Sequence, residues 1–501
     1  MTRPSLSLAQ AWRPDELRRL ADRWDQNARV LHAHVRAAAA AVPDAWTGAA
    51  ADQARARAQV FRARGDRIAR ALVMAAVAAR DGADQLIAAQ RDVVNVANAA
   101  RREGFRVDDD GSVVPDADPS ALLILLSGSD AAVAGDLLEL RADDLSRRMS
   151  AALDRLGAAD DDAAHDIDEA FQQADATHSL ATVPAGAHQP AAGPGWDAAI
   201  ANNRDAIAQA ILDQSPDERN AKQRIAFYRS LLGEVDDPAG TGQRVDRQIL
   251  TFDPDRGALI ELNGDLRGAK SVAVLVPGMN TTIEGSAANT RTARQFVEAS
   301  RGDVAAITFL GGPFPQDERM VTALAEAADP RFAIDMAPRL VAFSHDVDRV
   351  VDGTGRDIAV TYVGHSYGGA ILGTAEALGL TADRTFYVAA AGAGFGVDDP
   401  ADWHNRNPHV LRFAMTAPAD PIQLVQGIPG GPHGADPDHL PGVVRLATGH
   451  YDDSRLMAGP AAHTDVVNYV DSDAWRNVLA VISGDWEGLQ LARSPSRTNP
   501  R

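Results

Sequence analysis

Two patterns of apolar residues divide the chain. In the first 180 residues, apolar side chains recur three or four positions apart, as at Leu17, Leu20 and Trp24, which is the spacing of one face of an α-helix. From about residue 248, short runs rich in β-branched residues alternate with helical stretches. The pattern predicts an all-α region followed by an α/β region.

The first region begins with two long helices, predicted over residues 14–41 and 49–102. The segment between them contains Pro43, Asp44 and Gly48, which break a helix or cap its end. An antiparallel helical hairpin is therefore expected, with Trp46 covering the apolar seam at the turn.

A third helix is predicted over residues 131–174, after a turn-rich connector at 104–119. One face of this helix carries Leu137, Leu138, Leu145, Met149, Leu153 and Leu156. With 501 residues, the chain exceeds what one hydrophobic core usually supports. The predicted division is a helical domain at 1–180, a linker at 181–196, a helical lead-in at 197–245, an α/β domain at 246–490 and a disordered tail at 491–501. The lead-in helix is expected to pack on the α/β domain.

The α/β region contains eight apolar runs that are typical of strands. They are residues 249–252, 258–262, 272–276, 304–309, 358–363, 385–389, 410–415 and 443–447. Helical stretches at 286–300, 331–352, 368–380 and 473–483 lie between or after them. Strands that alternate with helices predict a doubly wound, mostly parallel sheet.

Composition narrows the classes of partner. The net charge of −20 argues against nucleic acid, which needs clustered cations. No apolar run approaches the roughly 20 residues of a membrane span, and the first residues lack the apolar core of a signal peptide. A cytoplasmic protein is expected, with any export by a route that needs no signal peptide. Because Cys is absent, disulfides and cysteine-ligated metals are excluded.

One motif carries chemistry. Residues 364–368 read Gly-His-Ser-Tyr-Gly, directly after an apolar run and directly before a good helix sequence. In this context G-x-S-x-G is the nucleophile elbow of α/β-hydrolases, a sharp turn that exposes a serine hydroxyl. The motif predicts Ser366 as a nucleophile, with the following helix offering N–H groups to a developing oxyanion.

A second loop supplies the other part of the expected oxyanion hole. The run at 271–276 leads into Pro-Gly-Met-Asn, and in α/β-hydrolases a loop after an earlier strand provides one of the two donors. We assign the N–H groups of Tyr367 and Met279 to the oxyanion. Gly278, Asn280 and His365 are assigned to the substrate site, although Asn280 could instead cap the next helix and His365 could be structural.

The acid of the expected triad should follow the serine, and the histidine should follow the acid. Asp420 comes just after the run at 410–415, at the sheet edge where active-site groups gather. Asp383, Asp452 and Asp453 fit this position less well.

Four histidines follow Asp420 and are candidates for the base. His463 precedes the last predicted helix, the usual place for it, and is preferred over His450. His433 and His439 lie in a Gly/Pro-rich loop better suited to a lid. The expected mechanism forms an acyl-enzyme and requires no metal or cofactor.

The segments at 274–281, 363–369, 416–421 and 463–469 together resemble actinobacterial α/β-hydrolases of the domain-of-unknown-function type, related to cutinase-like and lipase-like enzymes. This resemblance covers residues 245–485. It implies a triad of Ser366, His463 and Asp420 and an esterase or lipase-like activity on a small or lipid-like ester.

The N-terminal hairpin resembles a WXG100-type domain, because two long helices meet at Trp46-Thr-Gly48. Such domains are associated with type VII secretion, so this resemblance implies export by that route. The export signal usual for them, a Tyr followed four positions on by an acidic residue, has no match before Tyr228. Residues 1–104 could pair with a helical protein partner, with a second copy, or with the helix at 131–174.

Three hypotheses for the function remain open at this point. The first is an active serine hydrolase, which an in-order set of serine, aspartate and histidine favours. The second is a secretion-associated interaction protein that uses the hydrolase fold as a scaffold, and the third is an acyltransferase with the same triad.

Overall fold

The computed structural model describes residues 3–128, 130–175, 196–215, 218–316, 329–426 and 431–492. They form two compact units. The helical unit contains the described residues up to 175 and Ile207–Gly233, and the α/β unit contains residues 196–206 and those from Glu234 onward. Among the described helices, none is both long enough and apolar enough to cross a membrane.

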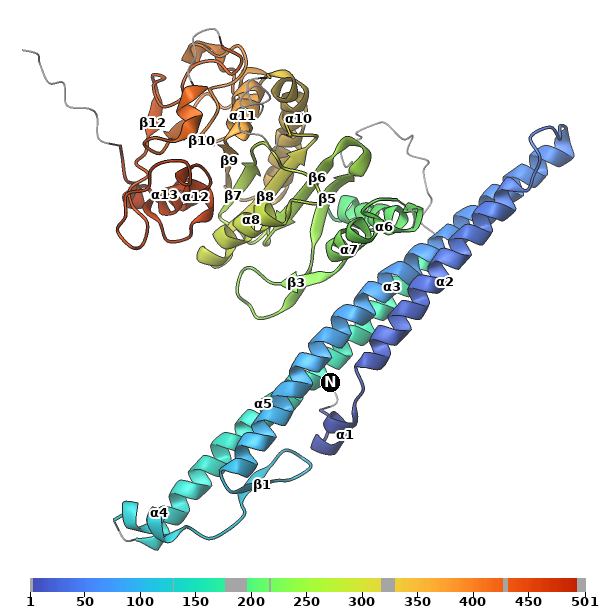
Figure 1. Cartoon of the computed structure of the whole chain (residues 1–501), viewed down its shortest axis with the longest axis vertical. Coiled ribbons are helices and arrows are strands. Elements are labelled where there is room, and N and C mark those ends of the chain that lie inside the picture. Colours follow the sequence, from blue (N-terminus) through green and yellow to red (C-terminus); the bar gives the residue numbers. More distant parts are fainter. Residues whose placement is uncertain are drawn as a thin grey trace, which may run out of the picture. The chain divides into compact units, whose positions relative to one another are not determined.

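Three long helices build the helical unit. They are α2 (Asp15–Ala40), α3 (Ala49–Arg102) and α5 (Ala131–Asp175). The 54-residue helix α3 packs along both α2 and α5 (Figure 1). The predicted third helix is thus one partner of the N-terminal hairpin, and short helix α1 (Leu6–Ala11) adds to the same core.

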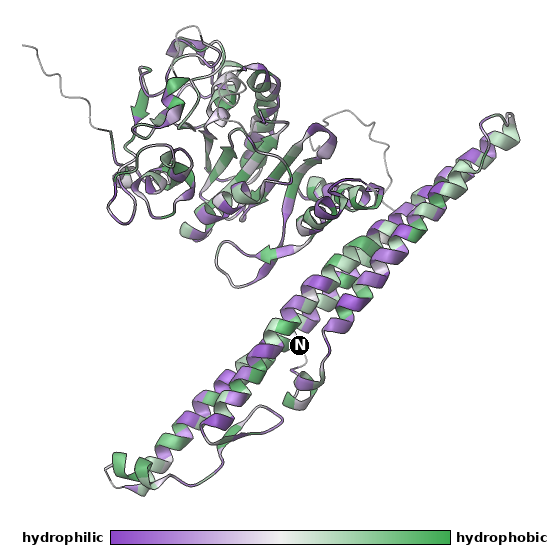
Figure 2. Ribbon diagram, viewed as in Figure 1, coloured by the Kyte–Doolittle hydropathy of each residue, from purple (hydrophilic) through white to green (hydrophobic). Residues whose placement is uncertain are grey.

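Small residues let these helices approach one another closely. A Cβ atom at Gly65 of α3 would lie 2.3 Å from Cγ1 of Val35 in α2, and a Cβ at Gly82 would lie 2.5 Å from Cβ of Ala163 in α5. Buried alanines such as Ala21 and Ala76 occupy the same interfaces. Figure 2 shows hydrophobic and hydrophilic residues interspersed along each long helix.

Three expectations for the helical unit need correction. Trp46 is 45% exposed at the α2–α3 turn, so its side chain does not cover the apolar seam. Leu137 is 47% exposed, because α5 turns this side chain away from α3 near its own beginning. The connector contains an antiparallel hairpin of β1 (Phe105–Val107) and β2 (Val113–Pro115), where only turns were expected.

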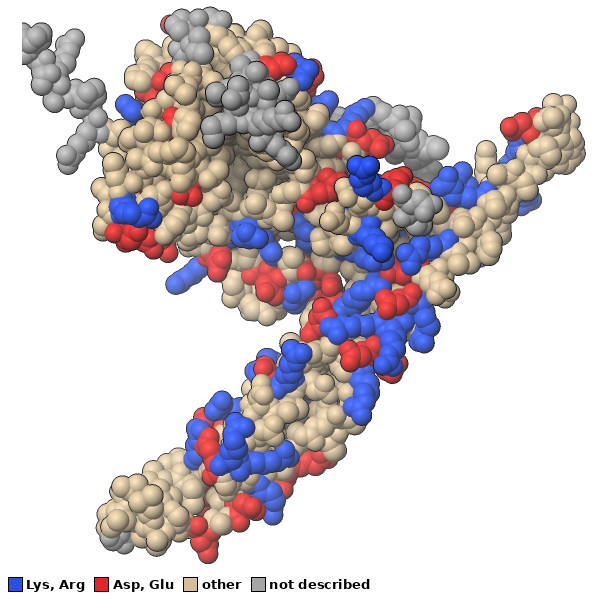
Figure 3. Space-filling view, viewed as in Figure 1, with Lys and Arg blue, Asp and Glu red and all other residues tan. Residues whose placement is uncertain are grey.

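Charged residues of both signs mix along the helical unit (Figure 3). The end that carries the short helix α4 (Ala121–Leu126) is largely uncharged and exposes Leu122, Leu125 and Leu126.

The eight predicted strands form one sheet in the α/β unit, in the order β12-β11-β10-β9-β7-β8-β6-β5. Their bounds are β5 (Gln248–Asp253), β6 (Ala258–Asn263), β7 (Ser271–Val276), β8 (Val304–Gly311), β9 (Ala359–His365), β10 (Arg384–Val388), β11 (Leu411–Met415) and β12 (Val443–Arg445). The six strands from β12 to β8 run parallel, while β6 is antiparallel to β8 and to β5. The expected mostly parallel sheet is confirmed.

Helices cover the sheet, and alternate side chains of each strand face opposite ways. The helices α8 (Ala287–Ala299), α12 (Ala462–Asn468) and α13 (Asp473–Ser483) share one core with strand residues such as Phe386. The helices α10 (Arg331–Gly353) and α11 (Tyr367–Ala377) pack on each other, and Phe343 of α10 contacts Phe309 of β8.

The lead-in at 197–245 divides between the two units, contrary to its expected packing on the α/β domain alone. Helix α6 (Asp197–Asp213) begins in the α/β unit and ends in the helical unit, which also contains α7 (Ala221–Leu232). Residues 234–246 form the antiparallel pair β3 (Glu234–Asp236) and β4 (Arg244–Asp246). Most of the predicted linker and residues 493–501 of the predicted tail lie outside the described residues, while Leu491 forms a β-bridge with Leu446.

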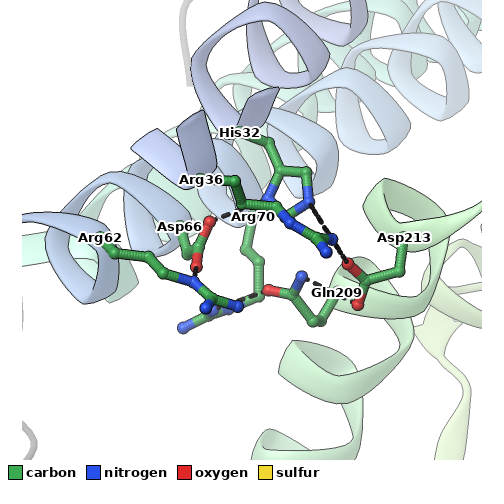
Figure 4. Close-up of polar contacts among 7 residues, drawn as sticks. All are labelled: His32, Arg36, Arg62, Asp66, Arg70, Gln209 and Asp213. Atoms are coloured by element: carbon green, nitrogen blue, oxygen red, sulfur yellow. Dashed lines mark hydrogen bonds and ion pairs between the residues drawn. The ribbon is translucent and has the colours of Figure 1, made fainter. Parts of the chain in front are cut away.

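Hydrogen bonds and ion pairs join the end of α6 to the α2–α3 hairpin (Figure 4). The buried imidazole of His32 lies 2.8 Å from Asp66 through Nδ1 and 3.3 Å from Asp213 through Nε2. Arg36 also pairs with Asp213, at 3.1 Å. This polar cluster explains why α6 ends in the helical unit.

Candidate active site

Ser366 occupies the turn between the central strand β9 and helix α11. Its φ of 56° and ψ of −122° are strained for a residue with a Cβ. Backbone hydrogen bonds hold this conformation: the Ser366 N–H donates to the carbonyl of Val388 at 3.1 Å, and its carbonyl accepts from the N–H groups of Gly369 and Ala391, each at 3.0 Å. The turn is the sharp strand-to-helix bend that the motif predicts.

The two outer glycines of the motif make this bend sterically feasible. A Cβ at Gly368 would lie 2.1 Å from the carbonyl oxygen of Val276, and one at Gly364 would lie 2.6 Å from the carbonyl oxygen of Gly368. Both close neighbours are backbone atoms, which cannot rotate away. Any side chain at these positions would therefore push β7 and α11 away from the serine.

His463 and Asp420 lie beside Ser366 in one hydrogen-bonded row. The Nε2 atom of His463 is 2.9 Å from Oγ of Ser366, and its Nδ1 atom is 3.0 Å from both carboxylate oxygens of Asp420. The Asp420 side chain is fully buried, whereas that of His463 is 25% exposed. The arrangement can transfer a proton from the serine to an imidazole whose orientation the carboxylate fixes.

The segments that carry the proposed acid and base are joined by a backbone hydrogen bond. Asp420 follows β11 and accepts a hydrogen bond from the N–H of Ile422 at 2.9 Å. His463 lies in the first turn of α12, a short helix that the sequence pattern did not predict. Ahead of it, the N–H of Gly459 donates to the carbonyl of Pro418 at 2.8 Å, so the two loops keep a fixed distance.

His365 contacts the backbone of the proposed base. Its Nε2–H donates to the backbone carbonyl of His463 at 2.7 Å. Burial, together with the neighbouring His463, lowers the pKa of His365 to about 4, so this imidazole is neutral near pH 7 and keeps one N–H donor. This contact favours the structural alternative for His365, and its assignment to the substrate site stays a prediction.

The glycine loop after β7 lies against the serine. A Cβ at Gly278 would be 2.8 Å from Cβ and 3.1 Å from Oγ of Ser366, so only glycine leaves the hydroxyl accessible from this side. Two residues after Gly278, the N–H of Asn280 donates to the carbonyl of Pro315 at 2.8 Å, so this donor already has a partner within the protein. Within the described part of the chain, the Met279 N–H has no hydrogen-bond acceptor.

The Tyr367 N–H is the first of helix α11, and N–H groups at this end of a helix point out along the axis. The phenol of Tyr367 is buried on the other side of the turn, where its hydroxyl donates to the carbonyl of Asp329. The side chain thus anchors the beginning of α10.

The other histidine candidates lie with different partners. His433 is buried with its ring edge-on to Tyr367, so it belongs to the core and not to a lid. His439 pairs with Asp436 at 2.7 Å on the surface, and the backbone N–H of His450 donates to Asp473 at 2.9 Å. Part of the predicted lid loop, residues 427–430, lies outside the described residues.

The rejected carboxylates also lie elsewhere. Asp383 accepts hydrogen bonds from the N–H of Val360 and from Asn407, at the opposite end of the strands. Asp452 accepts from the Tyr469 hydroxyl and Asp453 pairs with Arg455.

Comparison with known families agrees with this fold. Residues 253–428, which include Ser366 and Asp420, match the family model described as alpha/beta hydrolase. The C-terminal unit is an α/β-hydrolase domain. The matched α/β-hydrolase segment ends before His463, and a search of curated proteins finds no match to the chain.

Solved structures similar to the chain include esterases, at low identity. A hyperthermophilic esterase from Pyrobaculum calidifontis is 14% identical, with 57% of this chain and 96% of that one covered and a TM-score of 0.25. A thermostable esterase from Pseudomonas putida is 15% identical, with 42% and 60% covered and a TM-score of 0.20. A Thermus thermophilus protein is 13% identical, with 45% and 98% covered and a TM-score of 0.24.

Proposed function

We propose that the α/β-hydrolase domain is a serine hydrolase that cleaves carboxylic esters. The observation that carries the proposal is the hydrogen-bonded row of Ser366, His463 and Asp420, with 2.9 Å between the serine Oγ and the imidazole Nε2. A serine at a strained turn, a histidine within hydrogen-bond reach and a buried carboxylate behind it are the parts that acyl transfer needs.

In the proposed reaction, neutral His463 accepts the Ser366 proton as Oγ attacks the ester carbonyl carbon. Asp420 accepts the hydrogen bond from Nδ1–H and stabilises the imidazolium that forms. As the tetrahedral intermediate collapses, the imidazolium gives its proton to the departing alcohol and an acyl-enzyme remains. Water, deprotonated by the same imidazole, then releases the acid and restores Ser366.

The N–H groups of Tyr367 and Met279 are proposed to donate to the oxyanion. Backbone donors preorganised at the point where negative charge develops contribute roughly 3–4 kcal/mol each in serine hydrolases. Gly278 makes room for the carbonyl beside Oγ, as its close approach to Ser366 suggests.

The nucleophile can be tested with a fluorophosphonate probe, which reacts with activated serines. The full-length protein should be labelled, and the Ser366→Ala variant should not. The matched control is Ser483→Ala, because Ser483 is an exposed serine whose hydroxyl bonds only to helix backbone. Folded protein that resists labelling would refute the hydrolase and favour a scaffold role for the fold.

The substrate class can be tested with p-nitrophenyl esters of increasing acyl length. Release of p-nitrophenol that depends on Ser366 supports ester cleavage, and the optimum chain length reports the size of the acyl site. Added alcohol distinguishes the acyltransferase alternative: preferential formation of a new ester over free acid would assign acyl transfer in place of hydrolysis.

A further inference from the structure

A cavity lies in the α/β unit between helix α8 and the β3–β4 hairpin. Its volume is about 550 Å³, within the roughly 300–1,000 Å³ of small-molecule sites. Its lining contains three arginines, Arg247, Arg291 and Arg294, and none of the residues proposed for catalysis. The cavity therefore requires an explanation of its own.

Arg247 forms a rigid and neutralised part of the wall. Its guanidinium makes two hydrogen bonds with the buried carboxylate of Glu261, at 2.8 and 2.7 Å. Thr290 of α8 donates to the same carboxylate at 2.8 Å. This bidentate pair fixes the geometry of the wall and uses both oxygens of Glu261.

Arg294 and Arg291 are not neutralised in this way. The half-buried Arg294 donates to the backbone carbonyl of Asp236 at 2.7 Å and forms no ion pair with a described residue. Burial lowers the pKa of Arg294, and the charges of Arg247 and Arg244 lower it further, against partial compensation by Glu261 and Asp236. Arg291, one turn earlier on α8 and exposed, also has no ion pair within the described residues.

Among the described residues, no acidic side chain of the lining forms an ion pair with these two arginines, although the charge of Asp236 partly compensates that of Arg294. Asp237 accepts hydrogen bonds from the N–H of Ala239 and the hydroxyl of Thr241, within its own turn. The side chain of Asp236 is 91% exposed and lies 3.4 Å from Arg244. Glu298 is exposed one turn after Arg294, at the end of α8.

We propose that this cavity binds a small molecule through a carboxylate or phosphate group held by Arg294 and Arg291. A planar guanidinium donates two parallel hydrogen bonds to either group, and an anion removes the electrostatic cost of a half-buried, unpaired cation. The volume exceeds that of the anionic group alone, which leaves room beside Pro238 and Gly240 for a further moiety of the ligand. The site is separate from the proposed ester-cleaving residues.

Isothermal titration calorimetry on the full-length protein at low ionic strength tests the proposal, with inorganic phosphate and citrate as probes. Saturable binding of at least one anion is expected, and the stronger of the two identifies the recognised group. Arg294→Gln should weaken the binding of that anion about ten-fold or more, because charge-assisted hydrogen bonds contribute roughly 1.5–3 kcal/mol. If Arg294→Gln does not fold, the exposed Arg291→Gln serves the same purpose.

Two further variants make the result specific. Glu298→Gln should strengthen binding, because it removes a negative charge one helical turn from Arg294. Arg349→Gln removes the same charge from an exposed side chain of α10 and should leave anion binding unchanged. Absence of saturable binding of either anion up to about 10 mM, or equal weakening by Arg349→Gln and Arg294→Gln, overturns the proposal. Ser366→Ala should bind normally, which separates this site from the proposed esterase.

Discussion

The two units use glycine for opposite purposes. In the helical unit, Gly65 and Gly82 lie inside long helices and let a neighbouring helix approach closely at Val35 and at Ala163. In the α/β-hydrolase domain, Gly278 and Gly368 bring backbone up to a single side chain, Ser366, and to the turn that holds it. Stability in the first unit is therefore spread over many small contacts, whereas the proposed chemistry in the second depends on a few atoms.

The largest effect should follow from changing one of those few atoms. Asp420→Asn preserves the shape of the side chain but favours the wrong tautomer of His463, so kcat for a p-nitrophenyl ester should fall by roughly 10³–10⁴. The matched control is Asp436→Asn, which alters the surface pair of Asp436 and His439 and should leave kcat unchanged. A loss below about ten-fold for Asp420→Asn would remove Asp420 from the proposed mechanism.

The next effect concerns acid stability of the α/β-hydrolase domain. The pKa of His365 is lowered from 6.5 to about 4 in the folded protein, so the unfolded chain takes up this proton first as the pH falls. The contribution of His365 is present above pH 6.5 and is lost between about 6.5 and 4, on the order of 1–3 kcal/mol. Urea midpoints measured across this range should fall with pH.

His365→Gln sharpens this test, because glutamine keeps an N–H donor for the His463 carbonyl but does not titrate. Its urea midpoints should depend less on pH between about 6.5 and 4. The exposed His439→Gln should retain the wild-type profile. If both variants behave alike, His365 does not cause the acid sensitivity.

A smaller effect is expected in the helical unit. Gly65→Ala places a methyl group against Val35 and should destabilise the protein by about 1–3 kcal/mol, although alanine is the better helix former. In a Val35→Ala background the same change should be neutral or stabilising, because the clash is gone. Thermal unfolding followed by circular dichroism measures both, and equal effects in the two backgrounds would argue against close packing at this point.

The smallest effect should come from Trp46. Because this side chain is 45% exposed, Trp46→Ser should change the free energy of unfolding by no more than about 0.5 kcal/mol. The buried Leu145→Ala, by comparison, should cost roughly 2–5 kcal/mol through the cavity it leaves. A large loss of unfolding free energy in Trp46→Ser would mean that the Trp46 side chain at the α2–α3 turn is packed against other residues.

The two units also differ in how well their sequences predict them. Every strand of the α/β sheet was predictable, because β-branched runs such as β7 are bounded by turns and stay apolar on both faces. Candidates for the triad could be selected because, in this fold, the acid follows the serine along the chain and the histidine follows the acid. In the structure the three residues lie within hydrogen-bond distance in one row, and their catalytic roles stay predictions.

What the sequence did not predict has physical causes. Trp46 and Leu137 are apolar by type, but whether a helix end is covered depends on its neighbours and not on periodicity. The hairpins β1–β2 and β3–β4 have strands of only three residues, too short for an alternating pattern to be recognised. The contact of His365 with the His463 carbonyl joins residues 98 positions apart, and no local pattern records it.

The position of His463 on α12 has a consequence for how the protein is made. Ser366 leaves the ribosome 97 residues ahead of the imidazole that is proposed to activate it. During that interval the later partners of the elbow, Gly368, Val388 and Ala391, are also synthesised, so the turn can form while the hydroxyl still has no base beside it. On the proposed mechanism, a nascent chain would be inert toward the cell's esters until α12 had been synthesised and had docked.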